Sequence, residues 1–293
     1  MPNSFNAIAL EQQAAYRSRL EQCPTLTSDY SFVNLWSWAQ EYELTWAWQG
    51  ELVWIRQQKP EVRLWAPIGP WDRIDWQQAL MRSGFETDTF VRIPEKLMHL
   101  WRQQLKAHVS IEDERGQWDY LYAVDELVEL RGNRFHKKKN LVSQFKKKYD
   151  FRYQPFEAAL IDRAVAMQQD WCTWRDCEAV DALAAENNAI AKVFDTWDRL
   201  TGLTGGALLV DDQMVAYTIA ETLPDGTLLI HFEKGNPEYK GVYQAINQMF
   251  LAQAGHTASV VNREQDLGDD GLRRAKLSYL PVDFHKKYQV VLK

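Results

Sequence analysis

The stretch GGALLVDDQMVAYTIAETLPDGTLLIHFEKGNPEYKG, residues 205–241, decides the fold of the second half of this chain. Apolar runs lie on both sides of the Asp-Asp pair at 211–212, which is typical of a tight hairpin turn. A Pro-Asp-Gly turn at 224–226 then precedes a third apolar strand. A glycine-containing loop follows, and a helix is predicted over 242–253. The stretch therefore predicts three successive strands, a loop and a helix.

The segments around this stretch complete an α+β order. Two Ala- and Leu-rich segments, 156–170 and 179–200, predict helices before the first strand. After the helix comes VNREQDLGDDGLRRAKLSYLP, residues 261–281, which reads as a strand, a loop and a short helix. KYQVVLK, residues 287–293, reads as a final strand. This order predicts the α+β class, with a mostly antiparallel mixed sheet flanked by helices.

The first half of the chain has its own core. A helix is predicted over 8–20, and strands are predicted between 44 and 67. Ten of the thirteen tryptophans fall within residues 1–118, an asymmetry that favours two separate cores. A length of 293 residues also suggests two domains, because domains commonly hold about 100–200 residues. The expected domains are 1–130 and 151–293, joined by a basic linking helix, 131–150.

The linking segment concentrates positive charge in an acidic chain. The net charge is −6, but residues 131–148 carry eight Lys and Arg and no Asp or Glu, which leaves −14 elsewhere. Such a tract attracts a polyanion locally, so it is either a phosphate-docking helix or a solvated connection between domains. The candidates for phosphate contacts here are Arg134, Lys137, Lys138 and Asn140.

Composition also suggests a compartment. No apolar stretch approaches the roughly 18 residues that a transmembrane helix requires, and the N-terminus lacks the pattern of a signal peptide. Cys172 and Cys177 have no second ligand pair, and the histidines show no metal-ligand spacing. We therefore expect a cytoplasmic protein with reduced thiols, no integral membrane segment and no bound metal.

The order of elements in the second half resembles the GNAT-type acyltransferase fold. That fold places the phosphates of its acyl donor at the loop after the third of these strands, here residues 235–241. Lys240 and Gly241 precede a predicted helix, whose N-terminal N–H groups favour an anion, while glycine permits close approach. Of the usual GNAT loop pattern, Gln/Arg-x-x-Gly-x-Gly/Ala, only the central glycine matches, so the loop does not single out coenzyme A.

Four blocks resemble a more specific family: SDYSFVNLWSW (28–38), APIG (66–69), DYLYAVDELVELRGNRFHKKKN (119–140) and NREQDLGDDGLRRAKLSYLP (262–281). They are similar to bacterial proteins related to the C-terminal catalytic domain of phosphatidylglycerol lysyltransferase. The resemblance implies two tandem GNAT-like domains with a cleft between them, as in Fem-type aminoacyltransferases. It also implies transfer of an aminoacyl group from a tRNA. This chain lacks the relatives' large N-terminal membrane region, so a soluble or peripheral acceptor is expected.

Acyl transfer needs a group that takes the proton of the acceptor nucleophile. Glu264 and Asp266 are the candidate bases, because an extended segment places residues two apart on the same face. Close like charges raise one carboxyl pKa and suit it to proton transfer near neutrality. Glu233, at the end of the neighbouring predicted strand, is a third candidate.

The helical part of 262–281 offers cations and a hydroxyl. Arg273 and Lys276 are three residues apart and share a helix face, which suits them to hold phosphate or an acceptor carboxylate. Tyr279 is a candidate proton donor to the leaving group, as a tyrosine is in GNAT-type enzymes. Each has an alternative: Arg273 pairs with Glu264 to lock the loop, and Tyr279 is a core residue. His231 is expected to be a packed strand residue rather than a base.

Three functions remain open from the sequence. The first is an acyltransferase that moves an aminoacyl group from aminoacyl-tRNA to a soluble or peripheral acceptor. The second is a coenzyme A-dependent N-acyltransferase of a small amine. The third is a non-catalytic module that binds RNA or another polyanion on a degenerate transferase fold. No tightly bound cofactor is expected, because aminoacyl-tRNA or an acyl-CoA is a donor substrate.

Overall fold

The computed structural model describes residues 4–175, 180–254 and 257–293. Its contacts divide the chain into two compact units. Unit 1 comprises Met1–Asp119, Gln265–Arg273 and Phe284–Lys293, and unit 2 comprises Tyr120–Glu264 and Arg274–Asp283. The units thus interleave in sequence, whereas the expected domains, 1–130 and 151–293, are continuous. The basic segment 131–150, expected as a linker, lies inside unit 2.

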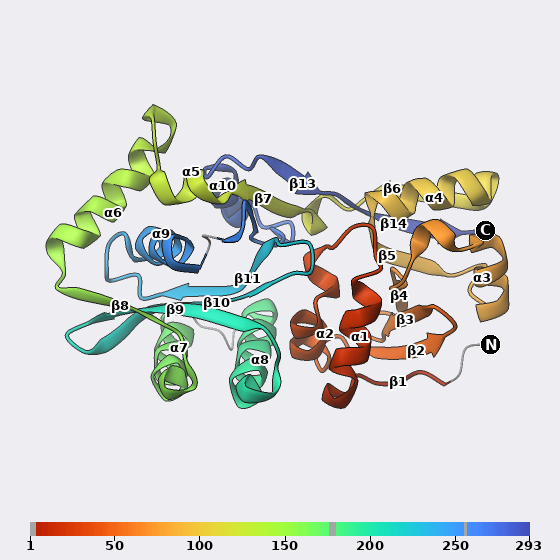
Figure 1. Cartoon of the computed structure of the whole chain (residues 1–293), viewed down its shortest axis with the longest axis horizontal. Helices are drawn as coiled ribbons and strands as arrows, with labels where there is room; N and C mark the ends of the chain where they lie inside the picture. Colours follow the sequence, from red (N-terminus) through yellow and green to blue (C-terminus); the bar gives the residue numbers. More distant parts are fainter. Residues whose placement is uncertain (1–3, 176–179, 255–256) are drawn as a thin grey trace. The chain divides into compact units, whose positions relative to one another are not determined.

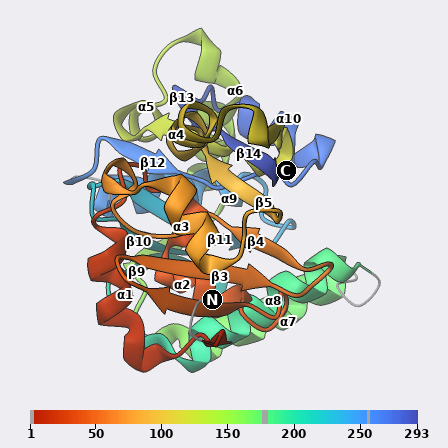
Figure 2. The same ribbon diagram turned by 90° about the vertical axis from the view of Figure 1, so that its right-hand side faces the viewer.

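Unit 1 is built on a seven-stranded sheet, sheet A, in the order β1-β2-β3-β4-β5-β14-β6. Strands β4 and β5 pair in parallel, and the other recorded pairs are antiparallel. The strands are β1 (Asn6–Ala7), β2 (Thr45–Gln49), β3 (Leu52–Gln57), β4 (Arg63–Trp65), β5 (Thr89–Pro94), β6 (Val109–Asp113) and β14 (Lys287–Leu292). The helices are α1 (Gln13–Leu20), α2 (Phe32–Trp38), α3 (Trp76–Ser83) and α4 (Glu95–Leu105), of which α3 lies in front of the strands in Figure 2.

The tryptophans of the first half form the core of unit 1. Trp76 and Trp101 meet edge to face, with ring centroids 5.5 Å apart, a geometry worth about 0.5–1.5 kcal/mol beyond burial. The side chain of Asp75 caps α3 by accepting from the Gln78 N–H, and Gly84 ends the helix with φ +76°. The tryptophans that are at most 2% exposed are Trp46, Trp54, Trp65, Trp71, Trp76 and Trp101.

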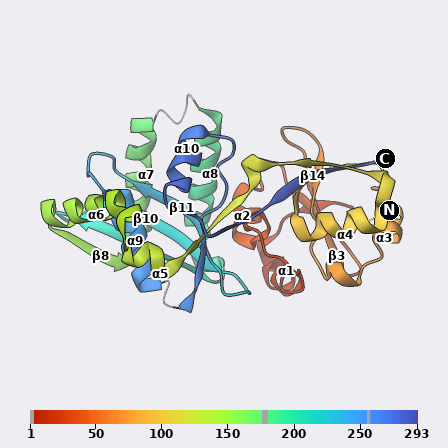
Figure 3. The ribbon, with the colours of Figure 1, turned by 90° about the horizontal axis from the view of Figure 1, so that it is seen from above.

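The last strand of the chain lies in the sheet of the first half. β14 pairs antiparallel with β5 on one side and with β6 on the other. Figure 3 shows it as the dark blue ribbon that leads to the C-terminus. KYQVVLK is therefore a strand as predicted, but it does not join the sheet of the second half. Its apolar residues explain the position, because Val290 and Leu292 are buried in the core of unit 1.

Unit 2 contains a second seven-stranded sheet, sheet B, in the order β13-β7-β12-β11-β10-β9-β8. The strands are β7 (Asp119–Ala123), β8 (Phe151–Pro155), β9 (Leu203–Val210), β10 (Gln213–Thr222), β11 (Leu228–Gly235), β12 (Val260–Asn262) and β13 (Asp283–His285). The hairpin at 211–212 is confirmed, and both residues have positive φ, as a two-residue turn with the twist of the strands requires. The predicted α+β class with mostly antiparallel sheets is also confirmed.

Helices cover both faces of sheet B, as Figure 1 shows. Helices α7 and α8 lie against one face, and α9 lies against the other, with α6 packed on α9. Gly241, with φ +86°, permits that packing, because a Cβ atom there would overlap the Leu141 carbonyl of α6. The helices are α5 (Val124–Glu129), α6 (His136–Lys148), α7 (Ile161–Arg175), α8 (Asp181–Asp195), α9 (Val242–Ala254) and α10 (Asp270–Leu277).

Strands β11 and β12 run side by side for a short distance. Their parallel pairing joins Leu228 to Val261 and Leu229 to Asn262, after which β12 ends while β11 continues to Gly235. The chain then turns at Glu264, which has φ +56°, and the Asn262 side chain accepts a hydrogen bond from the Glu264 N–H. The residues that follow β12 therefore lie beside the second half of β11.

The remaining sequence expectations concern membranes and thiols. No helix among the described residues is long and apolar enough to span a membrane. Cys23 is a free, buried thiol, whereas Cys172 takes part in a disulfide bond, so the expectation of reduced thiols is wrong for Cys172. Cys177 lies outside the described residues.

Candidate functional site

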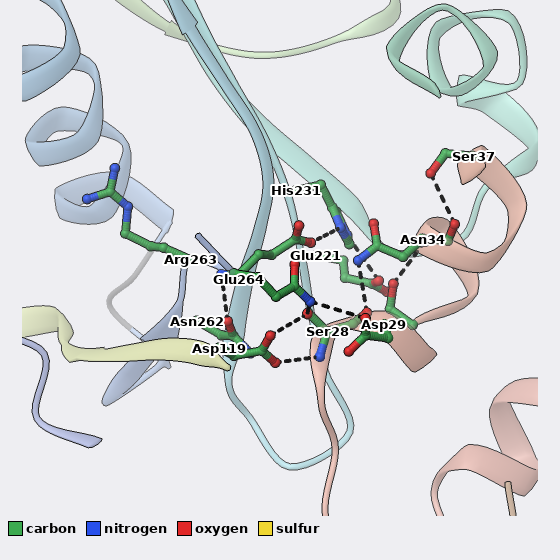
Figure 4. Close-up of polar contacts among 12 residues, drawn as sticks. Ser28, Asp29, Asn34, Ser37, Asp119, Glu221, His231, Asn262, Arg263 and Glu264 are labelled. Carbon is green, nitrogen blue, oxygen red and sulfur yellow. Dashed lines mark hydrogen bonds and ion pairs between the residues drawn. The ribbon is translucent and has the colours of Figure 1, made fainter. Parts of the chain in front are cut away.

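A buried histidine lies between two carboxylates on sheet B (Figure 4). The Nε2 atom of His231 on β11 is 3.1 Å from Glu221 Oε1 on β10, and its Nδ1 atom is 3.3 Å from Glu264 Oε1. The side chains of His231 and Glu221 are 0% and 3% exposed, whereas that of Glu264 is 18% exposed. Glu264 is therefore the member of this histidine cluster that a ligand reaches.

The charges of the histidine cluster are set by its geometry. Burial opposes a charge on His231, but the hydrogen bonds and Coulomb attraction from Glu221 and Glu264 outweigh it and raise the pKa of His231 to about 9. At neutral pH the imidazole is therefore protonated, and both ring nitrogens donate to carboxylates.

A β-bulge positions His231. Ile219 of β10 pairs with Phe232 of β11, but the next residue, Ala220, pairs with Ile230, so His231 is the extra residue on its strand. Bulges re-aim a side chain and are frequent beside functional sites. The turn at Glu264 completes the arrangement by bringing a carboxylate from the end of β12 to the same histidine.

A second cluster adjoins the first along β11. The Oε1 atom of Glu233 accepts from Arg263 Nη2 at 2.9 Å, and its Oε2 atom accepts from Asn247 Nδ2 of α9 at 3.0 Å. The Thr218 hydroxyl lies 3.4 Å from the same Oε2 atom. Glu233, predicted as a catalytic carboxylate, is thus held by three donors, one of them an arginine.

Tyr279 and Lys138 extend this second cluster. The Arg263 guanidinium lies 4.8 Å from the centre of the Tyr279 ring, and the Lys138 ammonium of α6 lies 3.9 Å from the same centre. Tyr279 is 7% exposed, and its burial is the main cause of a pKa raised above the ordinary value. The structure therefore brings together three residues predicted for the site, Glu233, Tyr279 and Lys138, around an arginine that was not predicted.

Asp266 belongs to unit 1, whereas Glu264 belongs to unit 2. Its side chain is 0% exposed, and its carboxylate is bound by Arg273, with Nε–Oδ2 and Nη2–Oδ1 distances of 2.8 and 2.9 Å, and by Arg115 at 3.3 Å. The expected extended segment is wrong, because φ is positive at Glu264 and again at Leu267. The geometry favours a structural role for Asp266 and Arg273, which lock the loop before α10.

Lys276 also binds its own loop. Its ammonium donates to the backbone carbonyls of Arg263 and Glu264, the latter at 3.3 Å, and the Lys276 carbonyl accepts from the Tyr122 hydroxyl at 2.9 Å. Lys276 therefore fixes the turn that carries Glu264. In this arrangement its role is to position the site rather than to hold a phosphate.

The predicted phosphate loop and the basic helix share a surface recess. Gln144, Lys147 and Lys148 of α6 and Lys240 of the loop after β11 line a hollow of about 420 Å³. We call it the lysine recess. Three ammonium groups around one hollow make it attractive to phosphates.

The other predicted residues of α6 lie outside this recess. Lys137 and Asn140 are exposed on α6, and Arg134, just before it, pairs with Glu126. Partial neutralisation by Glu126 makes Arg134 a weaker phosphate ligand than the exposed lysines.

Unit 1 holds a buried ion network that sequence reasoning missed. The ammonium of Lys287 on β14 donates to Asp29 and, at 2.6 Å, to Asp119, and all three side chains are 0% exposed. Asp119 also accepts from Ser28 N at 2.8 Å and from Ser28 Oγ at 2.7 Å, as Figure 4 shows. Arg92 donates to Asp29 at 2.7 Å. We call these residues the lysine network.

Two residues of the histidine cluster, Glu221 and His231, were also not predicted as members of the candidate site. Glu221 ends the otherwise apolar run MVAYTIAE, and a charged residue in such a strand is a sign of a buried charge. His231 is the packed strand residue that the sequence predicts, but it also carries a charge between carboxylates. For Glu221 and His231 alike, the sequence signal is an ionisable residue within an apolar strand, because a buried ionisable group requires a partner.

Comparisons with known proteins agree with this architecture. The family model described as "Phosphatidylglycerol lysyltransferase, C-terminal" matches residues 21–291. A solved conserved protein of unknown function from Bacteroides thetaiotaomicron VPI-5482 is 26% identical, with 100% of both chains covered and a TM-score of 0.90. The structure of L-PGS from Bacillus licheniformis is 12% identical, with 97% of this chain and 91% of that chain covered and a TM-score of 0.66, which shows a shared fold.

Two further relatives bear on fold and length. The structure of FemX is 8% identical, with 99% of this chain and 98% of that chain covered and a TM-score of 0.59, and it too shares the fold. An uncharacterised protein of Mycoplasmoides gallisepticum is 27% identical over 176 residues, which are 59% of this chain and 55% of that protein. The chain thus spans about half the length of this curated relative. Because the family model covers nearly the whole sequence, the chain belongs to the phosphatidylglycerol lysyltransferase C-terminal family, with its acyltransferase fold.

Proposed function

We propose that this chain is an acyltransferase that takes an aminoacyl group from aminoacyl-tRNA, with its reacting centre at Glu264 in unit 2. The observation that carries the proposal is the histidine cluster. Buried ion clusters contribute little net stability, and perturbed ionisable groups gather at functional sites. Here the cluster combines a buried, protonated His231 with a Glu264 carboxylate that is 18% exposed.

The cluster suits proton transfer during attack on an ester. The lone pair of the acceptor's hydroxyl or amine attacks the ester carbonyl carbon of the donor, and the Glu264 carboxylate takes the proton of that nucleophile. The bond between the carbonyl carbon and the ribose oxygen then breaks, and the proton passes from Glu264 to that oxygen. His231 holds Glu264 in place throughout.

The donor's phosphates fit the basic surface of α6 and the loop after β11. In the lysine recess, Lys147, Lys148 and Lys240 present three ammonium groups from two elements of the same unit. Each phosphate that a lysine neutralises releases counterions, so binding depends strongly on salt. Strand β11 connects the two sites, because it carries His231 and leads directly into the loop that holds Lys240.

We specify the acceptor only by its chemical class. The family name refers to lysyl transfer to phosphatidylglycerol, which is the activity of the named protein. For this chain we propose a hydroxyl or amine acceptor, in solution or at a membrane surface. The attack described above is the same for either nucleophile.

Two assays test the donor. The purified chain is mixed with tRNA charged with labelled amino acids, and loss of the ester and appearance of a labelled product are followed with candidate acceptors. In parallel, thermal unfolding is measured with acetyl-CoA, because a bound ligand stabilises by mass action. We expect tRNA binding at micromolar concentration and no shift with acetyl-CoA. Stabilisation by acetyl-CoA, acetylation of an amine and no binding of tRNA would replace the proposal with coenzyme A-dependent acyl transfer.

The lysine recess also favours a second candidate, non-catalytic binding of a polyanion. That function predicts salt-dependent RNA binding that weakens in Lys147→Ala and is unchanged in Glu264→Gln, with no ester lost from charged tRNA. A transferase predicts a different result for Glu264→Gln, in which turnover stops while tRNA binding persists.

A further inference from the structure

One lysine of α6 points into unit 2 instead of toward solvent. Lys138 is half-buried, and its ammonium lies 3.9 Å from the centre of the Tyr279 ring. Among the described residues it has no carboxylate partner. Burial, together with the nearby positive charge of Arg263, lowers the pKa of Lys138. A cation placed there without an anion is costly, so a function is the expected reason for it.

Arg263, which contacts the same tyrosine ring, has a guanidinium nitrogen without a hydrogen-bond partner among the described residues. Its guanidinium lies 4.8 Å from the centre of Tyr279, and its Nη2 atom donates to Glu233. Its Nη1 atom is buried and has no hydrogen-bond partner among the described residues. A guanidinium nitrogen in that position lacks an acceptor, and a carboxylate or phosphate oxygen is the partner that its geometry matches.

The charges of this cluster do not balance. Lys138 and Arg263 contribute two positive charges, and Glu233, bound to Arg263 at 2.9 Å, contributes one negative charge. The excess positive charge lies on residues that adjoin the histidine cluster, because β11 carries both Glu233 and His231. A proton acceptor and an anion-binding group thus lie side by side in unit 2.

We propose that Lys138 and Arg263, whose cationic groups lie 3.9 Å and 4.8 Å from the centre of the Tyr279 ring, form a binding site for a phosphate or carboxylate group of a substrate. This inference rests on the proposed function and deepens it, because it assigns an anionic group close to the reacting atoms. The anion replaces water at the Lys138 ammonium and supplies the acceptor that Arg263 Nη1 lacks. Its source is either the terminal phosphodiester of the donor RNA or an anionic group of the acceptor.

Protection from chemical labelling tests the site without turnover. The lysines of the whole chain are modified with trace acetic anhydride, and the rate at each lysine is read by peptide mass spectrometry. Inorganic phosphate at about 10 mM is expected to slow modification of Lys138 roughly threefold or more, given a millimolar dissociation constant. Lys137 and Lys139, exposed on the same helix, are the matched controls, and their rates are expected to change little.

Separate arms identify the source of the anion. Protection by intact tRNA, but not by tRNA trimmed at its 3′ end, assigns the site to the donor. Protection by small phosphates or acetate that persists beside saturating tRNA assigns it to the acceptor. Equal protection of Lys138 and Lys137 in every arm would overturn the proposal.

Variants separate this site from the proposed function. In Lys138→Gln, phosphate binding measured by 31P NMR is expected to weaken at least about tenfold, whereas Lys137→Gln binds as wild type and Lys138→Arg restores binding. If Lys138 is protected but no aminoacyl transfer is found, the anion site stands and the proposed function fails. If transfer occurs and Lys138 is not protected, the proposed function stands and the anion site fails.

Discussion

The lysine network of unit 1 and the histidine cluster of unit 2 are both ionic assemblies, and they differ in how far their carboxylates are exposed. In the lysine network, Lys287, Asp29 and Asp119 are each 0% exposed, and the two carboxylates face two cations, Lys287 and Arg92. In the histidine cluster, Glu221 and Glu264 both contact His231, and Glu264 remains 18% exposed.

This difference distinguishes a structural assembly from a candidate reactive one. Burial works against ionisation of Asp119, but Lys287 outweighs it and keeps the pKa of Asp119 below its ordinary value. The network is closed, so it has no free group to offer a substrate. In the histidine cluster the Glu264 carboxylate is 18% exposed, and a proton acceptor must be reachable by its substrate in this way.

The largest expected effect tests the closed network. Lys287→Met removes the only ammonium in it among the described residues and leaves Asp29 and Asp119 buried without it. Removing one partner from a buried ion pair typically costs about 3–5 kcal/mol of unfolding free energy. Urea denaturation followed by circular dichroism measures this loss.

The matched control is the neighbouring residue. Lys286 pairs with Glu95 at 3.3 Å, with side chains that are 39% and 43% exposed, so Lys286→Met is expected to cost about 0–1 kcal/mol. An equal loss of unfolding free energy in Lys287→Met and Lys286→Met would contradict a larger contribution of the buried network to stability.

The second prediction concerns the pH dependence of stability. The pKa of His231 is raised from 6.5 in the unfolded chain to about 9 in the folded one, so its stabilisation is complete below pH 6.5 and is lost as pH rises through 9. The advantage of the wild type over His231→Gln should therefore shrink by about 3 kcal/mol across this window. Urea denaturation at a series of pH values measures it.

An exposed histidine provides the control. His99 lies on the surface of α4, and His99→Gln should follow the wild type at every pH. A constant difference between His231→Gln and the wild type from pH 6 to about 10 would contradict the charged histidine cluster.

The smallest effect is expected at the lysine recess. Lys147→Ala should lower the slope of log affinity against log salt for tRNA by about 0.7–0.9, the value for one phosphate contact. Lys146, on the same helix, donates to Gln248 at 3.2 Å and does not line the recess, so Lys146→Ala is the control. Fluorescence anisotropy at several salt concentrations gives both slopes, and identical slopes would remove the recess from the binding surface.

Local patterns predicted the elements of the fold well. The hairpin at 211–212, the turn at 224–226 and the helix from Val242 depend on nearest neighbours in sequence, which a pattern reads directly. The place of β14 in sheet A depends on partners about 180 and 200 residues away, and no local periodicity specifies which sheet a strand joins.

The candidate site was predictable only in part. Glu264 and Glu233 stood out as carboxylates at strand ends, and the structure places Glu233 on β11 and Glu264 beside that strand. Asp266 has the same sequence signal but is enclosed by two arginines, one of them 151 residues away. The link between His231 and Glu264 likewise arises from a bulge and a positive φ, features of the backbone that residue types alone do not encode.

The most direct test of the central claim is single-turnover release of the aminoacyl group from charged tRNA by Glu264→Gln, with unfolding free energy measured on the same sample. We predict that the rate falls by about 10²–10⁴-fold while tRNA affinity is unchanged and stability changes by about 1 kcal/mol or less. Asp266→Asn, the matched change in unit 1, should instead lose stability and keep the wild-type rate per folded molecule. A Glu264→Gln variant as fast as the wild type would contradict the claim that unit 2 reacts through this carboxylate.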